Sequence, residues 1–193
     1  MGQVIQICKV NYFKPLYIEG FLVFNKNELT YNMKQEKIEI SYQVFDGIDE
    51  LNNEDASLLR IANEVTNTAY APYSNFHVGA AARLTTGEIL TGTNQENASY
   101  PVGLCAERVL LATISSLHPG VPLEVMAISH HNKNGNSDHP IAPCGMCRQY
   151  IQEFENRLNK SFRLILGGLN GKIFVFEKAS QLLPIGFTSE SME

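Results

Sequence analysis

The chain has 193 residues, of which 44% are hydrophobic and 18% charged, and its formal net charge is −5. This composition is ordinary for a soluble globular protein, and the length predicts one domain with a substantial core. The negative charge and the lack of any basic run of five or more residues argue against binding to a nucleic-acid backbone, which is mainly electrostatic. The apolar runs are far shorter than the roughly 20 residues that a membrane span needs, and the N-terminus lacks a signal-peptide pattern.

Three patches rich in β-forming residues occupy the first part of the chain, at positions 4–10, 17–24 and 38–45. A long helix is predicted next, at residues 53–70. Asn52 or Asn53 can cap its start, and the Ala-Pro pair that follows stops it.

The rest of the chain alternates between strand and helix patterns. We predict strands at residues 77–84, 89–93, 124–129, 162–166 and 173–176, helices at 105–117 and 144–158, a polar loop at 131–142 and a helical turn at 181–183. Five strands that alternate with helices predict an α/β fold of three layers, with the sheet in the middle.

Three of the four cysteines lie in two short motifs. Cys105 begins the motif Cys-Ala-Glu-Arg, and Cys144 and Cys147 lie in the motif Pro-Cys-Gly-Met-Cys-Arg-Gln. Both motifs come at predicted helix starts, where unpaired N–H groups and the positive end of the helix dipole favour the metal-binding thiolate. Zinc prefers four tetrahedral ligands, so three cysteines leave one position for water, as in a catalytic site. Glu107 is well placed to reach that water.

These motifs resemble the signature of the zinc-dependent cytidine deaminase superfamily, in its three-cysteine form with a glutamate that is not a ligand. Residues 70–80 are similar to the entry into the first core strand of small nucleoside cytidine deaminases, and residues 92–101 to their ribose-binding strand end. The resemblance covers residues from about 48 to 187. It implies a three-layer α/β/α cytidine-deaminase-like fold with a central mixed five-stranded sheet, one Zn²⁺ per chain, and a homotetramer with active sites at subunit contacts.

The resemblance also implies roles for the metal motifs. Cys105, Cys144 and Cys147 are the expected zinc ligands, and Ala106 is expected to contact substrate. Glu107 is the expected proton carrier: it takes a proton from the zinc-activated water and delivers it to the pyrimidine, while the water attacks C4 and ammonia leaves.

Two arginines are candidates for tuning the metal charge. Three thiolates on one divalent ion leave a formal charge of −1, which opposes ionisation of the bound water. The helix N-termini can offset this charge, and so can an arginine that donates to the sulfurs. Arg108 has this role by resemblance, and Arg148 is a second candidate. The alternative for both is an ion pair at a surface or interface.

Substrate-binding residues are implied at a strand end. Asn94 and Glu96 are alternate residues of an extended segment, so their side chains point the same way. By resemblance they hydrogen-bond the ribose 3′-hydroxyl. Phe76 is expected to pack against the base and Phe187 to reach a neighbouring subunit's site. Core packing of Phe76 and simple docking of the C-terminal tail are the alternatives. All histidines are interpreted as structural or surface residues: His77, His118, His130, His131 and His139.

The resemblance does not include the first 32 residues. We therefore divide the chain into an N-terminal extension of uncertain role, 1–32, and a cytidine deaminase domain, 33–193. One hypothesis is that Met33 is the true start, because a chain of this family would begin near it. The other hypothesis is that residues 1–32 form an extra strand or hairpin. Cys8, in this stretch, is expected to be an inert thiol.

Together these patterns predict a zinc-dependent hydrolase that converts cytidine and 2′-deoxycytidine to uridine and 2′-deoxyuridine in cytoplasmic pyrimidine salvage. Thiols arranged for a metal instead of a disulfide framework indicate an intracellular protein. The expected partners are a nucleoside and further copies of the chain, with neither nucleic acid nor membrane. Two alternatives stay open: a deaminase of a modified pyrimidine nucleoside of the blasticidin type, and a non-catalytic zinc module. The pair Asn94 and Glu96 favours plain cytidine, and Glu107 argues against a closed structural site.

Overall fold

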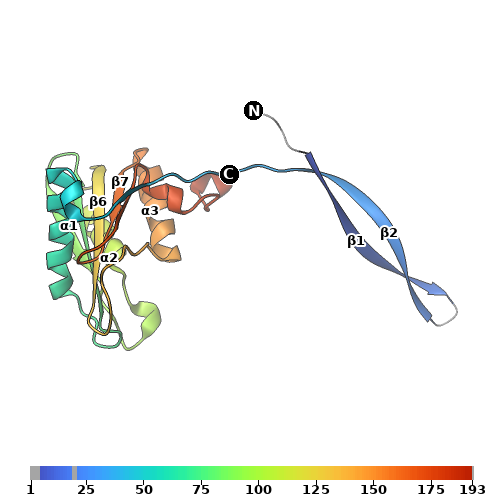
Figure 1. Cartoon of the computed structure of the whole chain (residues 1–193), viewed down its shortest axis with the longest axis horizontal. Helices are drawn as coiled ribbons and strands as arrows, with labels where there is room; N and C mark the ends of the chain where they lie inside the picture. Colours follow the sequence, from blue (N-terminus) through green and yellow to red (C-terminus); the bar gives the residue numbers. More distant parts are fainter. Residues whose placement is uncertain (1–4, 19–20, 193) are drawn as a thin grey trace. The chain divides into compact units, whose positions relative to one another are not determined.

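The computed structural model describes the backbone of residues 5–18 and 21–192 and the side chains of residues 34–192. The chain forms two units, which adjoin in sequence between Glu39 and Ile40. In the first unit, strands β1 (Ile5–Ile18) and β2 (Phe21–Lys34), labelled in Figure 1, pair as an antiparallel hairpin. Position 4 of the first predicted patch and positions 19–20 of the second lie outside the described residues. The two hypotheses about Met33 stay predictions.

The second unit is built on a mixed sheet of six strands within the described residues. The strands are β3 (Gln43–Phe45), β4 (Phe76–Leu84), β5 (Ile89–Thr93), β6 (Leu123–Asn132), β7 (Arg163–Leu166) and β8 (Ile173–Phe176). Their order is β3-β8-β7-β6-β4-β5; β6 and β7 are parallel and the other neighbours antiparallel. The sequence predicted five strands. The sixth, β3, is the last part of the predicted β-rich patch at 38–45. Only its three residues pair with β8 at the sheet edge, and residues 38–42 form no strand.

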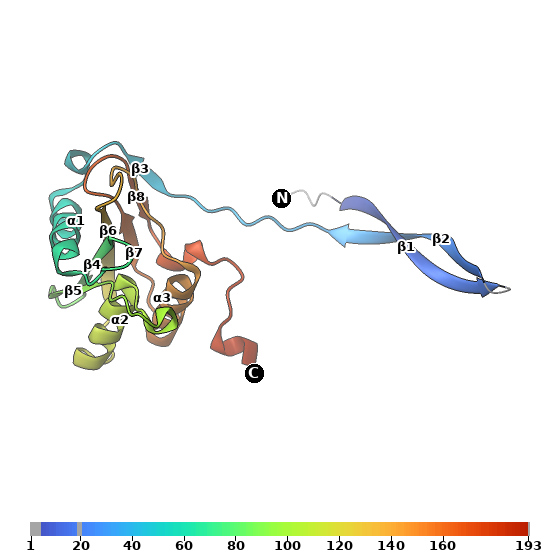
Figure 2. The same ribbon diagram turned by 90° about the horizontal axis from the view of Figure 1, so that it is seen from below.

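Helices cover both faces of this sheet. Figures 1 and 2 show α1 (Asn53–Val65) on one face and α2 (Ala106–Leu117) and α3 (Gly145–Leu158) on the other. Two separate apolar clusters fill the layers. The cluster under α1 includes Leu58, Leu59, Ala62, Val125, Ala127 and Ile165. The cluster under α2 and α3 includes Leu110, Ile114, Ile151, Met126, Ile128 and Leu164. Since alternate strand residues point to opposite faces, adjacent residues of β6 and β7 serve different clusters. The predicted three-layer α/β/α arrangement is confirmed.

Two predicted boundaries are wrong. Helix α1 ends at Val65 and not at residue 70, and a 3₁₀ turn at Thr66–Thr68 follows it. The Thr66 hydroxyl donates to the carbonyl of Asn63 at 2.7 Å. Such a bond back to the preceding turn tightens the helix end. Strand β6 continues to Asn132, so the polar loop begins two residues later than predicted.

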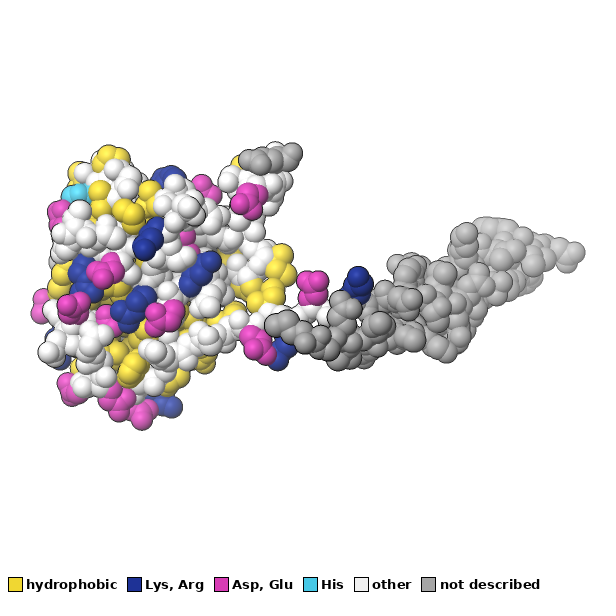
Figure 3. Space-filling view, turned by 90° about the horizontal axis from the view of Figure 1, so that it is seen from above, with side chains coloured by type: hydrophobic (Ala, Val, Ile, Leu, Met, Phe, Trp, Pro, Cys, Tyr) yellow, Lys and Arg dark blue, Asp and Glu magenta, His cyan; other side chains and the backbone are white. Residues whose placement is uncertain are grey.

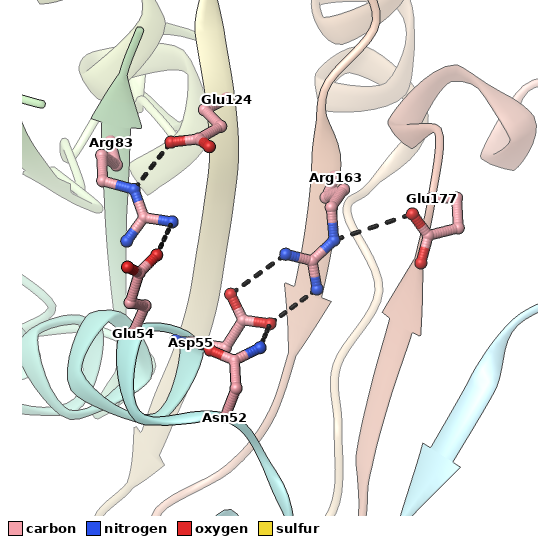
Figure 4. Close-up of polar contacts among 7 residues, drawn as sticks. All are labelled: Asn52, Glu54, Asp55, Arg83, Glu124, Arg163 and Glu177. Carbon is pink, nitrogen blue, oxygen red and sulfur yellow. Dashed lines mark hydrogen bonds and ion pairs between the residues drawn. The ribbon is translucent and has the colours of Figure 1, made fainter. Parts of the chain in front are cut away.

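A buried charge pair fixes the start of α1 to the sheet (Figure 4). Asp55 is only 2% exposed and accepts two hydrogen bonds from the Arg163 guanidinium of β7, at 3.1 and 2.6 Å. Asn52 is the N-cap: its Oδ1 accepts from the Asp55 N–H at 2.9 Å, and its Nδ2 donates to the Asp55 carboxylate at 2.8 Å. Nearby, Arg83 of β4 bridges two further carboxylates. Because buried charges are stable only when paired, these contacts hold α1 in one place on the sheet.

The described surface carries charges of both signs. On the face in Figure 3, Lys and Arg side chains are interspersed with Asp and Glu, and no basic stripe runs across the coloured part of that face. A continuous basic stripe is the electrostatic signature of nucleic-acid binding. Within the described residues, no helix is both long enough and apolar enough to cross a bilayer.

Candidate active site

The three motif cysteines meet in space. Cys105 comes directly before α2, Cys144 directly before α3, and Cys147 lies in the first turn of α3. The Sγ atoms of Cys105 and Cys144 are 3.8 Å apart and those of Cys144 and Cys147 are 3.5 Å apart. All three lie within 4.8 Å of one another. Two sulfurs bound at about 2.3 Å to a tetrahedral zinc ion are about 3.8 Å apart. The three sulfurs therefore fit three of the four zinc ligand positions.

Both helix starts present their cysteine to a metal. Cys105 and Cys144 are N-cap residues with extended backbones, and neither side chain makes a capping hydrogen bond. The unpaired N–H groups of α2 and α3 therefore lie close to the sulfurs. Hydrogen bonding with the Cys147 thiol is the largest influence on the pKa of Cys105. Together with hydrogen bonding to Cys144 and the charge of Arg108, it outweighs burial and the negative charge of Glu107 and lowers this pKa to about 6. Cys105 thus readily forms the thiolate that zinc requires.

Glu107 lies in the first turn of α2, beside the cysteines. It is only 5% exposed, and it lines the same cavity as Cys105 and Cys144. Burial raises the pKa of its carboxyl group. Glu107 therefore holds a proton more readily than an exposed glutamate does, which suits a group that accepts and then releases a proton.

A cavity of about 460 Å³ lies over the cysteines. Its size is in the range of small-molecule sites. The lining includes the expected substrate residues Phe76, from the start of β4, and Asn94 and Glu96, which follow β5. The fold thus brings together two helix starts and two strand ends that are far apart in the sequence. Cys105 and Cys144 line this cavity, whereas the other expected site residues do not: Ala106, Arg108, Cys147, Arg148 and Phe187.

Asn94 is tied to the neighbouring strand β4. Its Oδ1 accepts a hydrogen bond from the Val78 N–H at 2.7 Å, and its Nδ2 donates to the Phe76 carbonyl at 2.9 Å. The side chain therefore joins the segment after β5 to the start of β4. One amide hydrogen and one oxygen lone pair remain for a ligand.

Glu96 supports the loop before β4. Its carboxylate accepts hydrogen bonds from the Tyr73 N–H at 2.9 Å, from the Ser74 N–H at 3.3 Å and from the Ser74 hydroxyl. Burial raises the pKa of Glu96, but these hydrogen bonds outweigh it and lower the pKa overall. Glu96 is therefore ionised at neutral pH, and its two oxygens can still accept from a ligand hydroxyl.

Arg148 connects the start of α3 with the C-terminal segment. Its Nε donates to the carbonyl of Pro143 at 2.8 Å, and its Nη1 donates to the carbonyl of Leu182 at 3.0 Å. This bridging position is absent from the sequence-based interpretations, because nothing local to the motif indicates where residue 182 lies. Arg108, in contrast, has only a minor influence through its charge, which lowers the pKa of Cys105, and its role beside the sulfurs stays a prediction.

Phe187 lies in an exposed C-terminal segment. Its side chain is 58% exposed, and its carbonyl accepts a hydrogen bond from Gln149 Nε2 of α3 at 2.8 Å. The backbone turns at Ile185 with a φ of 56°, a conformation that β-branched residues rarely adopt. The backbone of this segment is thus held on α3 while the Phe187 ring stays accessible.

Residues 52–160 match the model of the protein family described as the cytidine and deoxycytidylate deaminase zinc-binding region. The chain belongs to this family. A cytidine deaminase of Halalkalibacterium halodurans is 36% identical over 137 residues, which are 70% of this chain and 95% of that protein. The crystal structure of cytidine deaminase from Burkholderia pseudomallei is 34% identical, with a TM-score of 0.60, and covers 71% of this chain and 100% of that one. A blasticidin-S deaminase of Bacillus cereus is 28% identical over 140 residues, 72% of this chain and 95% of that protein.

Membership of the cytidine deaminase family agrees with the geometry of the site. The predicted family, the predicted enzyme class and the zinc cofactor are confirmed, and the matched region contains the three cysteines and Glu107. The individual roles of the site residues, including that of Glu107, stay predictions. Two residues near the site carry contacts that the sequence did not indicate: Arg148, described above, and His130, which is fully buried against Phe76.

Proposed function

We propose that this cytidine deaminase family member hydrolyses cytidine and 2′-deoxycytidine to uridine and 2′-deoxyuridine, with release of ammonia. One observation carries the proposal: a single cavity is lined by Glu107 and by two of the three expected zinc ligands, Cys105 and Cys144, together with Phe76, Asn94 and Glu96. The cavity therefore offers a proton carrier at a metal position and, in the same space, an aromatic ring and two polar side chains for a base and a sugar.

Each residue has a defined task in this reaction. A zinc ion held by the three thiolates supplies Lewis-acid activation of water. Glu107 accepts the proton of the attacking water and passes it to N3 of the cytosine ring, then assists protonation of the exocyclic amine. The water oxygen forms a bond to C4, the C4–N bond breaks, and ammonia leaves. Glu107 is only 5% exposed, so little of its side chain contacts bulk water.

Charge in the cavity favours a free nucleoside. Glu96 is ionised, because three hydrogen bonds from residues 73–74 lower its pKa. A carboxylate accepts readily from the 3′-hydroxyl of ribose, whereas it repels a 5′- or 3′-phosphate nearby. Asn94 offers its remaining amide hydrogen to the same sugar edge. These contacts support nucleoside substrates over nucleotides or polynucleotides.

The assembly and the cellular role are part of the proposal. We expect a homotetramer whose sites include Phe187 from a neighbouring copy; support comes from the exposure of Phe187 and of Tyr100, which is 75% exposed beside the cavity. We expect a role in pyrimidine salvage in the cytoplasm. The catalytic domain is proposed to be residues 33–193, with residues 1–32 as an extension. Mass spectrometry of the N-terminus of the native protein tests this division, since a first residue before Met33 contradicts a start at Met33.

The decisive experiment measures zinc content and the turnover of cytidine and deoxycytidine, by loss of absorbance and by ammonia release. We expect about one zinc per chain and turnover of both nucleosides. Glu107→Gln should keep the zinc and lose activity by about 10²–10⁴-fold, because it removes the proton carrier. Glu153→Gln, an exposed glutamate on α3, is the matched control and should behave as the wild type.

Two outcomes contradict parts of this proposal. If zinc is bound but neither nucleoside is turned over, the assignment of substrate is wrong, and blasticidin S becomes the next substrate to assay, given the related blasticidin-S deaminase. If Glu107→Gln keeps full activity, the assignment of the proton carrier is wrong.

A further inference from the structure

Three aromatic rings contact one another in a row that starts at Phe76, the residue expected to pack against the base. The ring of Phe76, which lines the cavity, stacks on His130 with 5.0 Å between centroids and 20° between planes. His139 meets His130 edge-on, also at 5.0 Å, with an interplanar angle of 61°. We call these residues, Phe76, His130 and His139, the ring column. Its first member faces the cavity, and its middle member is fully buried.

The sheet register creates the contact between Phe76 and His130. In the antiparallel pairing of β4 with β6, Phe76 lies opposite Asn132, and Val78 lies opposite His130. His130 is therefore the diagonal neighbour of Phe76 on the same face of the sheet, within reach of an aromatic side chain. Because the register is fixed along both strands, the position of the His130 ring determines where the Phe76 ring can rest.

His130 is fully buried, and neither of its ring nitrogens has a well-aligned hydrogen bond, although the backbones of Gly167 and Asn136 lie near the ring and oppose the lowering of its pKa. The contact that its ring does make is the stack on Phe76. Burial, and to a lesser degree the nearby His139, lowers the pKa of His130, which keeps the imidazole neutral. A neutral flat ring stacks readily against Phe76.

The loop that carries His139, the last member of the ring column, is held in place by contacts with the sheet and its turns. The Ser137 hydroxyl accepts a hydrogen bond from the Asn132 N–H at 2.8 Å, and the Ser137 carbonyl accepts from the Leu169 N–H at 2.7 Å. Gly171, with a φ of 78°, lets the turn between β7 and β8 approach so closely that a Cβ there would lie 2.0 Å from the Asp138 carbonyl oxygen. The loop that carries His139 is therefore fixed relative to the sheet. The His139 ring limits the space into which the His130 ring can move.

We propose that His130 is a positioning residue for substrate binding: it holds the Phe76 ring in the plane against which the pyrimidine packs. The inference rests on the proposed function, because it assumes that the base contacts Phe76. His130 itself touches neither substrate nor metal ligands, so its effect is on KM and not on the chemical step. A ring of similar shape at this position should preserve the effect, and a non-aromatic side chain should lose it.

The test compares His130→Phe with His130→Leu in the full-length zinc enzyme. Loss of an aromatic pair corresponds to about a threefold to tenfold change in an equilibrium constant. We therefore expect His130→Leu to raise KM for cytidine by about that factor, with kcat within about twofold of wild type. His130→Phe should keep KM close to the wild-type value. Zinc content and melting temperature are measured for each variant, and His130→Met replaces His130→Leu if the latter does not fold.

A double-mutant cycle with Phe76→Leu decides whether His130 acts through Phe76. If it does, adding His130→Leu to Phe76→Leu should leave KM unchanged, since the ring to be positioned is already gone. Equal KM values for wild type and His130→Leu overturn the proposal, as does a KM increase that persists in the Phe76→Leu background. Failure of the wild type to turn over cytidine would instead overturn the proposed function. The two failures are therefore distinguishable.

Discussion

The metal side of the cavity and its nucleoside side are built in different ways. On the metal side, Cys105 and Cys144 are helix N-caps and Cys147 lies within one turn, so each position follows from a helix start. On the nucleoside side, Asn94 and Glu96 are held by hydrogen bonds to the β4 strand and to the loop before it. Each half of the metal side is set by a local helix start, and the fold then brings the two halves together, whereas each residue of the nucleoside side is held in place by tertiary hydrogen bonds. Substitutions on the metal side should therefore reduce zinc binding, whereas substitutions on the nucleoside side should reduce substrate binding and stability.

The largest effect is expected on the metal side. Cys147→Ala should reduce the zinc content from about one per chain to near zero and abolish turnover, because Cys147 is the buried member of the three-cysteine group. Metal analysis and the cytidine assay measure both results. Cys8→Ala is the control, since Cys8 lies outside the two motifs, and it should keep both zinc and activity. Full zinc occupancy in Cys147→Ala would show that the ligand set is wrong.

An intermediate effect is expected for Asn94, and it should include stability. Asn94→Ala leaves the Val78 N–H without its acceptor and removes the bond to the Phe76 carbonyl. Loss of such a partner costs about 1–3 kcal/mol of unfolding free energy. Urea denaturation should show this loss together with a raised KM, while the zinc content stays at the wild-type level. Asn94→Asp keeps the acceptor for Val78 and should be the milder variant. A raised KM with unchanged stability would mean that Asn94 serves the ligand alone.

The smallest expected effect is a change in how the melting temperature depends on pH when His130 is replaced. Burial lowers the pKa of His130 in the folded state below the ordinary value of about 6.5, so the unfolded chain binds a proton more readily. The resulting destabilisation of the fold is absent well above pH 6.5 and grows as the pH falls below that value. Each unit of difference between the two pKa values corresponds to about 1.4 kcal/mol. His130→Phe should therefore lose less melting temperature between pH 7.5 and 5.5 than the wild type does. Parallel curves for the two proteins would contradict this assignment.

The same division explains what could be predicted from the sequence. The cysteines and Glu107 lie in short motifs whose chemistry depends on spacing and on a helix start, so the order of the amino acids is enough to recognise them. The stacking of His130 on Phe76 depends on the register between β4 and β6, and the contact of Arg148 with Leu182 depends on where the C-terminal segment returns. No local pattern encodes either contact. The length of the edge strand β3, which is only the end of the β-rich patch at 38–45, and the early end of α1 likewise depend on tertiary pairing and packing, and local patterns did not predict them.

At the two cysteine N-caps, the residue that binds zinc best is not the residue that caps a helix best. Serine or aspartate at position 105 or 144 would satisfy an unpaired N–H of the helix, which is worth about 1 kcal/mol at each end, but would bind zinc far less well than a thiolate. The chain keeps cysteine at both positions, so the first turns of α2 and α3 lack side-chain caps of their own. A zinc ion bound to both cysteines would join two uncapped helix ends at a single point. In this fold, a catalytic ion would therefore also act as a structural cross-link between sequence segments that are otherwise distant.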